Sequence, residues 1–343
     1  MTAPDQPLVR EAGDPPEPGP GEARIRVVGC GVCHTDLGFL YGGVRTKHPL
    51  PLALGHEIAG TVEAVGEGAE AWAGKDVVVP AVLPCGDCEL CLAGHECACQ
   101  RQLMPGNDFH GGFASHLVAP VRWLVDAGGL PAGLELQDVS VLADAVTTPY
   151  QAMVRAKVGD GDHAVLIGAG GIGSFGVQIA AAMGARTVAV DVDDLKIERA
   201  LAHGAVAGVN TRGLDAKAAR KAVQAACKEA GFPRHGLKVF EMSGTPAGQE
   251  LAWSLMSHAG TVAIVGFCLD RVPVRLSNLM AFDAEAFGNW GCRPQLYAPA
   301  LDLIRAGQVQ VGPFVRRFPM DEINQVLQDV HHHRIPERPV LVP

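Results

Sequence analysis

The chain has 343 residues, of which 48% are hydrophobic, and its 37 acidic side chains outnumber 28 basic ones, for a net charge of −9. Such a chain lacks the basic surface that nucleic acids and acidic membranes require, so neither is an expected partner. The length and apolar content predict a globular protein with two domains. Because the first 22 residues contain no apolar segment typical of a signal peptide, a cytoplasmic location is expected.

Short segments with β character fill the first half of the chain. The segment "ARIRVVGCG" (residues 23–31) alternates apolar and polar side chains like a strand and breaks at glycines. Similar segments follow as "EIAGTVEAVG" (57–66), "DVVVPAVL" (76–83) and "GFASHLVAP" (112–120). This half is therefore expected to form a partly closed β structure with loops.

Residues 85–99 read "CGDCELCLAGHECAC" and hold five of the ten cysteines. Four of them follow the spacing C-x2-C-x2-C-x7-C: Cys85, Cys88, Cys91 and Cys99. In a reducing cytosol such clusters bind metal more often than they form disulfides, and zinc takes four thiolates. An iron–sulfur cluster is the rival, but in ferredoxins the fourth cysteine follows after three residues and precedes proline. The sequence therefore favours a closed structural zinc site, with Cys97 left over.

Two segments offer ligands to a second metal centre. "GCGVCHTDLG" (29–38) contains Cys33 and His34, and "GHEIAG" (55–60) contains His56 and Glu57. A catalytic zinc needs about three protein ligands and one open position. Considered singly, Cys33 is equally well a buried apolar thiol, and His56 a core histidine.

The pattern changes near residue 150, where strand-like and helix-like segments begin to alternate. Strands are expected in "HAVLI", "RTVAVDV", "AVAGVN", "LKVFE" and "TVAIVGF", with helices between them. The helix after the second strand is expected to start at a cap, Asp193 or Asp194, and to stop at Gly204. This alternation predicts a parallel sheet covered on both faces. Residues 164–185 carry no charge, but six glycines and the strand–turn–helix pattern argue against a membrane span.

A G-x-G-x-x-G motif follows the first of these strands and opens a helix, the context in which the motif indicates a dinucleotide site. Gly168 would permit the tight turn, Gly170 the approach of a pyrophosphate, and Gly173 close helix–strand packing. A glycine turn without a ligand is the alternative. Asp191 ends the second strand, where a carboxylate binds ribose hydroxyls and repels a 2'-phosphate, so NAD is favoured over NADP. The turn residues expected to contact the cofactor are Gly168, Gly170, Gly171, Ile172 and Gly173.

From about residue 288 the pattern becomes less regular. The last segment, "RPVLVP" (338–343), is expected to return to the first half as a closing strand. The run His331–His333 suggests a metal site, but consecutive residues at a helix end point in different directions. A solvated face is the favoured interpretation.

"GVCHTD", "GHE", the four-cysteine segment and the later glycine motif, in this order, resemble the zinc-containing medium-chain alcohol dehydrogenase family from residue 5 to 343. The resemblance implies an α/β protein in which a GroES-like β-rich catalytic domain, residues 1–147 and 288–343, is interrupted by an NAD-binding Rossmann domain with a doubly wound parallel sheet, residues 148–287. It further implies two zinc ions per chain, NAD as coenzyme, and a homodimer or homotetramer.

The resemblance also assigns roles to individual residues. Cys33, His56 and Asp144 would bind the catalytic zinc, and Glu57 could swing toward it. Thr35 would contact the alcohol and take its proton, and Asp36 would orient His56. The expected coenzyme contacts are His34 at the pyrophosphate, Lys196 beside the adenosine ribose and Thr148 at the nicotinamide.

The sequence departs from the family pattern at Gly38, where many relatives have a histidine that completes a proton relay. The glycine also leaves room for an alcohol bulkier than ethanol. The implied reaction is hydride transfer from a zinc-polarised alcohol to NAD+, giving a ketone.

Stretches such as "RQLMPGNDFHGGFASH" most resemble the 6-hydroxycyclohex-1-ene-1-carbonyl-CoA dehydrogenase branch, which acts in anaerobic aromatic degradation. A secondary alicyclic alcohol on a coenzyme A thioester is therefore the expected substrate. The candidate phosphate contacts are Arg45, Lys47, Arg101 and Arg293. The alternatives are a general zinc alcohol or polyol dehydrogenase, a zinc-free enone or quinone reductase, and a non-catalytic zinc-binding relative.

Overall fold

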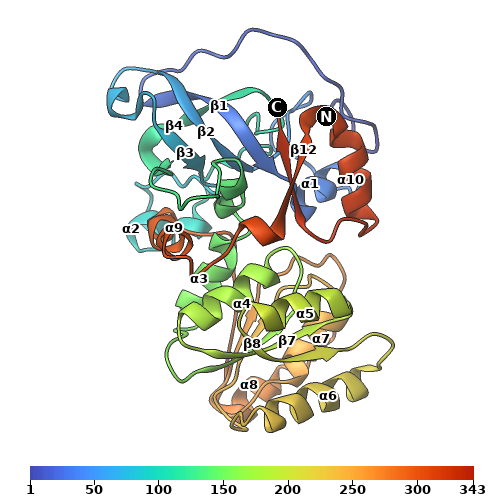
Figure 1. The fold of residues 1–343 in the computed structure, drawn as a ribbon. Coiled ribbons are helices and arrows are strands. Elements are labelled where there is room, and N and C mark those ends of the chain that lie inside the picture. The colour runs from blue at the N-terminus through green and yellow to red at the C-terminus, as the bar shows by residue number, and fades with distance from the viewer. The chain divides into compact units, whose positions relative to one another are not determined.

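A computed structural model describes residues 1–343, which divide into two compact units (Figure 1). Unit 1 consists of Met1–Thr147 and Gly291–Pro343, and unit 2 of Thr148–Trp290. The chain thus returns to unit 1 after Trp290, whereas the sequence analysis expects this return three residues earlier, at residue 288. Asn289 explains the difference, because its amide donates to the carbonyl of Thr148 at 3.2 Å and accepts from Gln151 at 3.1 Å.

Unit 1 is built on a seven-stranded sheet with the order β12-β13-β1-β2-β3-β5, in which β4 also pairs with β1. Along β1 the buried and less buried side chains largely alternate, as the sequence pattern predicts. The predicted closing strand is β13, which pairs antiparallel with β1 and parallel with β12. The strands are β1 (Glu22–Gly31), β2 (Glu57–Val65), β3 (Asp76–Val79), β4 (His116–Pro120), β5 (Val125–Asp126), β12 (Val315–Pro319) and β13 (Arg338–Val342).

The helices of unit 1 pack beside this sheet. Leu37 and Leu40 on α1 share a buried cluster with Leu327 and Val330 on α10, so residues from both ends of the chain form one core. A 3-10 turn, Asp138–Ala143, is buried along its whole length and leads to Asp144. The helices are α1 (His34–Leu40), α2 (Glu89–Leu92), α9 (Tyr297–Arg305) and α10 (Ile323–His331), while α3 (Thr147–Arg155) begins at the last residue before unit 2.

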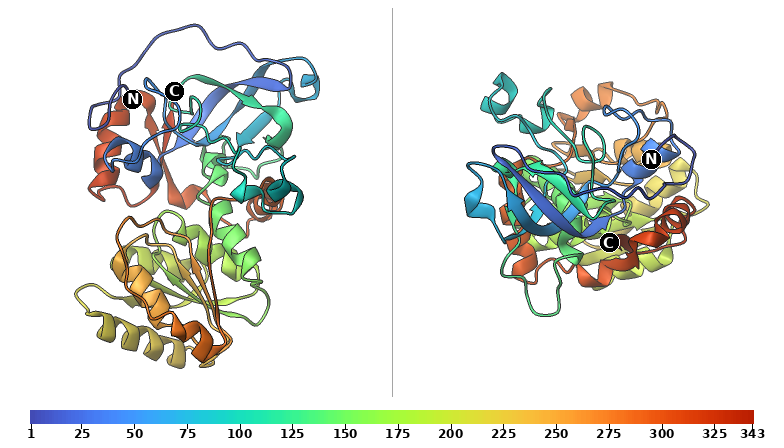
Figure 2. Two further views of the ribbon diagram at one scale, coloured as in Figure 1. Left: turned by 180° about the vertical axis from the view of Figure 1, so that it is seen from behind. Right: turned by 90° about the horizontal axis from the view of Figure 1, so that it is seen from above.

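Unit 2 is the predicted doubly wound fold. Its six strands are parallel and lie in the order β11-β10-β9-β6-β7-β8, with α4 and α5 on one face and α6 and α7 on the other (Figures 1 and 2). The strands are β6 (His163–Ile167), β7 (Arg186–Asp191), β8 (Ala205–Asn210), β9 (Lys238–Glu241), β10 (Thr261–Ile264) and β11 (Glu285–Gly288). The helices are α4 (Gly173–Ala182), α5 (Asp194–Ala202), α6 (Ala216–Glu229), α7 (Pro246–Ser254) and α8 (Ser277–Phe282).

Local chemistry explains several boundaries. Of the two candidate caps of α5, Asp193 is the cap residue, and its side chain accepts a hydrogen bond from the amide of Leu195. The helix ends two residues before Gly204, which adopts a φ of 118°. The uncharged stretch 164–185 is divided between β6 and α4, and no helix of the protein has the length and apolar character needed to cross a bilayer.

Candidate active site

Four possible metal ligands converge in unit 1. The ligand atoms of Cys33, His56, Glu57 and Asp144 all lie within 4.8 Å of one another. Cys33 is the N-cap residue of α1, His56 immediately precedes β2, and Asp144 follows the buried 3-10 turn. Three segments that are distant in sequence therefore present sulfur, nitrogen and oxygen donors to one point.

The spacing of these donors fits a zinc ion. The Oδ2 atom of Asp144 lies 3.6 Å from Sγ of Cys33 and 3.6 Å from Nε2 of His56. Ligand atoms bound to one tetrahedral zinc stand about 3.3–3.8 Å apart. A thiolate, an imidazole and a carboxylate also form a donor set that zinc accepts. Cys33, His56 and Asp144 could therefore hold a zinc ion with one position open.

Asp36 fixes two of these donors in place. It is fully buried, and its carboxylate accepts hydrogen bonds from the amide of Cys33 at 2.9 Å and from the amide of Gly55 at 3.1 Å. Its Oδ1 atom lies 3.3 Å from Nδ1 of His56. Burial lowers the pKa of His56, but Asp36, Asp144 and Cys33 together raise that pKa well above its ordinary value. The ring lies with Nδ1 toward Asp36 and with Nε2 toward Asp144.

Glu57 is bound by an arginine that sequence reasoning missed. Arg338, on β13, donates from Nε to Oε2 of Glu57 at 3.1 Å, and its Nη2 contacts Oε1. Both side chains are buried, at 6% and 0% exposed. Burial raises the pKa of Glu57, and the charge of Arg338 opposes that rise only in part. A side chain at Gly31 would collide with the Glu57 carboxylate, so the glycine makes room for the pair.

Thr35 and Gly38 lie on α1, the helix that begins after Cys33. The hydroxyl Oγ1 of Thr35 is 3.6 Å from Sγ of Cys33, and its side chain is half-buried. A Cβ atom at Gly38 would meet only Val44, at 3.6 Å, so packing does not require glycine there. Space therefore remains beside α1 at Gly38.

The four cysteines of the predicted structural site form a second cluster. The Sγ atoms of Cys88 and Cys91, and those of Cys85 and Cys99, lie 3.4 Å apart, and two further pairs lie 3.8 Å apart. A tetrahedral zinc with bonds of about 2.3 Å would place its four sulfurs about 3.8 Å apart. Cys97 is not among the four. The backbone at Cys91 lowers the pKa of Cys88 to about 7, whereas burial raises the pKa of Cys91 to about 12.

The glycine turn of unit 2 has the geometry expected of a nucleotide-binding loop. Gly168 adopts a φ of 91°, and a Cβ there would lie 2.7 Å from the amide nitrogen of Ser243. A Cβ at Gly173 would collide with the carbonyl of Gly168. At Gly170, by contrast, the nearest atom to a Cβ would be Nζ of Lys196, at 3.7 Å. Space remains beside Gly170, with a basic side chain at its border, while Gly171 and Ile172 complete the turn before α4.

Asp191 stands at the carboxyl end of β7, next to this turn. Its Oδ2 accepts a hydrogen bond from the amide of Ala169 at 2.8 Å, and its Oδ1 accepts from Val192 and Asp193 at 2.7 and 3.0 Å. These donors fix the carboxylate while leaving acceptor capacity for ribose hydroxyls. Thr148 is buried in α3 of the same unit, whereas His34 opens α1 in unit 1.

Comparisons with known proteins agree with this arrangement. The alcohol dehydrogenase GroES-like domain family matches residues 19–129, and the zinc-binding dehydrogenase family matches residues 171–306. An alcohol dehydrogenase of Geobacillus stearothermophilus is 32% identical over 339 residues, which cover 98% of this chain and 96% of that protein. An alcohol dehydrogenase of Moraxella is also 32% identical, with the same coverage.

Two solved structures extend the similarity. The alcohol dehydrogenase of Aeropyrum pernix matches with a TM-score of 0.87 and 28% identity, covering 100% of this chain and 98% of that one. A cobalt- and zinc-bound alcohol dehydrogenase of Pyrobaculum aerophilum matches with a TM-score of 0.84 and 25% identity, covering 100% and 98%. The chain therefore belongs to the family of zinc-binding alcohol dehydrogenases, and it is an oxidoreductase whose cofactors are zinc and NAD.

Proposed function

We propose that the chain oxidises a secondary alcohol to a ketone at the centre formed by Cys33, His56 and Asp144. The observation that carries this proposal is the convergence of three different zinc donors from three segments, with ligand-atom separations of 3.6 Å around Asp144. A fourth position left open by three ligands suits a catalytic zinc rather than a structural one.

When bound, zinc acts as a Lewis acid on the alcohol and NAD+ accepts the hydride. Asp36 holds His56 and the start of α1. The half-buried hydroxyl of Thr35, 3.6 Å from Sγ of Cys33, would accept the alcohol proton while passing its own proton on toward solvent. Arg338 keeps the Glu57 carboxylate paired within the protein.

Thr35→Ala tests the proton transfer. The variant should keep its metal and its coenzyme and should oxidise alcohol roughly 10²- to 10⁴-fold more slowly, as is typical of lost general acid–base catalysis. Single-turnover hydride transfer measures this directly. An unchanged rate of hydride transfer in this variant would contradict a role for Thr35 in proton transfer.

We further propose that the coenzyme binds at the glycine turn with its adenosine ribose on Asp191, and that Lys196 flanks this ribose. The carboxylate, fixed by three backbone amides, would repel the 2'-phosphate of NADP, so NAD is the preferred coenzyme. The remaining proposed contacts are His34 with the pyrophosphate and Thr148 with the nicotinamide. The four-cysteine cluster is proposed to hold a zinc without an open position, which suits a cytoplasmic, reducing environment.

For the substrate, we propose an alicyclic secondary alcohol carried on a coenzyme A thioester. The support is the sequence resemblance to that branch and the space beside Gly38. Of the candidate phosphate contacts, Lys47 pairs with Asp108 at 3.0 Å and Arg101 with Asp87 at 2.5 Å, whereas Arg45 is exposed. A general alcohol or polyol dehydrogenase is the competing assignment.

One screen separates these substrates. NAD+ reduction is followed with simple alcohols, polyols and cyclic hydroxyacyl-CoA esters, and the highest kcat/KM is expected for a cyclic ester. Higher kcat/KM values for the simple alcohols or polyols would assign the general activity instead. Reduction with none of the three would contradict the proposed oxidation itself.

We also propose a homodimer formed through the outer edge of unit 2. Strand β11 pairs only with β10, so its other edge is available for a second copy. Large apolar side chains are exposed nearby: Phe267, Leu276, Met280 and Trp290. Light scattering should give the mass of a dimer, and Met280→Glu should shift it toward the monomer.

A further inference from the structure

Asp144 is presented to the proposed zinc centre by an irregular segment, whereas Cys33 caps a helix and His56 immediately precedes a strand. It follows the buried 3-10 turn Asp138–Ala143 and has a φ of −143° and a ψ of −59°, a combination that belongs to neither a helix nor a strand. Its amide reaches the carbonyl of Val141 only at 3.4 Å. Contacts from outside the turn are therefore needed to hold this residue in one orientation.

A buried tyrosine from the returning part of unit 1 supplies such a contact. Tyr297 is the first residue of α9 and is fully buried, and its hydroxyl donates a hydrogen bond to the carbonyl of Ala143 at 2.7 Å. Burial raises the pKa of Tyr297 well above its ordinary value, so the hydroxyl keeps its proton and remains a donor. The amide of Ala81 donates to the same carbonyl at 3.3 Å. Two donors, from separate segments, thus hold this one carbonyl oxygen.

The orientation of this carbonyl bears directly on Asp144. The carbonyl of Ala143 and the amide of Asp144 belong to one planar peptide group, so the donors that hold the oxygen hold the whole plane. The Asp144 side chain extends from the end of that plane, and its Oδ2 lies 3.6 Å from both Sγ of Cys33 and Nε2 of His56. A rotation of the plane would carry the carboxylate away from one of these two donors.

We propose that Tyr297 is a positioning residue for the zinc ligand Asp144 and acts through the peptide group that links Ala143 to it. Tyr297 offers no ligand atom to the centre, so its hydroxyl affects the metal only by orienting the carboxylate. The inference rests on the proposed function, because it takes Asp144 as the third ligand. It adds that the zinc site depends on α9, an element from which no ligand comes.

The beginning of the same turn is held by a different contact. Arg317, on β12, donates from Nε and Nη2 to the two carboxylate oxygens of Asp138, at 2.8 and 2.7 Å. Asp138 is buried and is the first residue of the turn, whereas Ala143 is the last. Both contacts stabilise the turn, but only the acceptor of Tyr297 shares a peptide group with the ligand. Arg317→Met is therefore a control for loosening the turn at a distance from Asp144.

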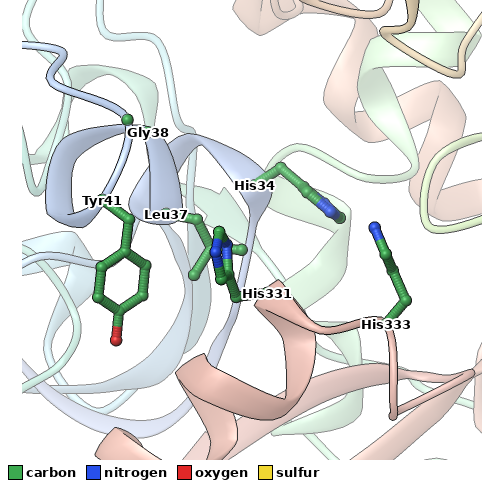
Figure 3. Close-up of a pocket in the computed structure, with 7 residues that line it drawn as sticks. His34, Leu37, Gly38, Tyr41, His331 and His333 are labelled. Atoms are coloured by element: carbon green, nitrogen blue, oxygen red, sulfur yellow. The ribbon is translucent and has the colours of Figure 1, made fainter.

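Tyr41 provides a second control, for the loss of a tyrosine hydroxyl elsewhere in unit 1. It follows α1, and its ring packs against His331, with ring centroids 5.1 Å apart, at the border of a cavity of about 290 Å³ (Figure 3). Figure 3 shows its hydroxyl directed away from Gly38 and His34. Tyr41→Phe removes this hydroxyl and leaves the contacts of the Asp144 turn unchanged.

Release of zinc from the holoenzyme to a chelator tests the proposal without reference to activity. The native protein should show a release phase that is missing from Asp144→Ala, and this phase belongs to the catalytic ion. Tyr297→Phe keeps the ring and should speed this phase at least about tenfold, because loss of a group that orients a metal ligand costs about 10- to 100-fold in metal affinity. Tyr41→Phe should release zinc at the native rate. Arg317→Met should speed the phase less than Tyr297→Phe does.

The Tm of each variant is measured in parallel, so that a loss of stability is not mistaken for a loss of metal. A lower Tm with native zinc release in Tyr297→Phe would assign the hydroxyl to stability alone and overturn the proposal. Equal acceleration in Tyr297→Phe and Arg317→Met would also overturn it, because any loosening of the turn would then suffice. Identical release from the native protein and Asp144→Ala would instead show that Asp144 is not a ligand, so failure of the proposed function is recognised separately.

Discussion

At the scale of single residues, the ion pair between Arg338 and Glu57 stands out because both side chains are buried. Removing one partner of a buried pair leaves an uncompensated charge, which costs far more than losing an exposed pair. The pair also joins the last strand of the chain to the first residue of β2, next to the proposed ligand His56.

Arg338→Met should lower the free energy of unfolding by about 3–5 kcal/mol. Adding Glu57→Gln should recover part of this loss, because no buried charge then remains unpaired. Chemical denaturation measures the free energy of unfolding of the native protein, of Arg338→Met and of the double variant. Arg10→Met is the control, since Arg10 and Asp321 form a pair that is 85% and 77% exposed and should contribute little. Equal stability of Arg338→Met and Arg10→Met would contradict the role of the buried pair.

Asp191 is the residue proposed to select the coenzyme. Asp191→Ser should weaken NAD+ binding, because the carboxylate is lost from the ribose, and should narrow the preference for NAD+ over NADP+ by removing the like charge. The ratio of the two kcat/KM values measures this preference. If the native enzyme already used both coenzymes equally well, Asp191 would not contact the ribose as proposed.

At the scale of elements, the cysteine segment and the glycine turn could be predicted because their determinants lie close together in sequence. The spacing of four cysteines within residues 85–99 suffices to indicate a closed metal site, and the turn lies directly between β6 and α4. Helix α1 was not predicted, since its seven residues are too few to show an apolar period. Strand β3 is shorter than "DVVVPAVL" suggests, because Pro80 lacks the amide that would continue the ladder.

The cysteine segment should act as one stabilising element without a part in the chemistry. Cys88→Ser should lower zinc content and thermal stability while the remaining folded enzyme keeps nearly normal turnover, because four thiolates leave no open coordination position. Cys97→Ser is the matched control from the same loop and should keep its zinc. Normal zinc content and stability in Cys88→Ser would contradict the proposed structural site.

At the scale of the whole molecule, the sequence predicts two domains, a parallel sheet in the second, and a return of the chain to the first. Alternating strands and helices support that prediction, because each strand–helix unit can be recognised from a short stretch of sequence. The pairing of Arg338 with Glu57 could not be predicted, since 281 residues separate them and no motif contains both residues. Asp144 could be identified only by resemblance, because nothing in "LADAVTTPYQA" itself marks a ligand.

The central claim is that Cys33, His56 and Asp144 hold the zinc at which alcohol is oxidised. Zinc content of purified Asp144→Ala, measured beside the native protein, tests it most directly. The native chain should contain two zinc ions and the variant one, with alcohol oxidation abolished and NAD+ binding retained, because the glycine turn and Asp191 belong to unit 2. Two zinc ions and near-normal turnover in Asp144→Ala would contradict the claim and place the third ligand elsewhere.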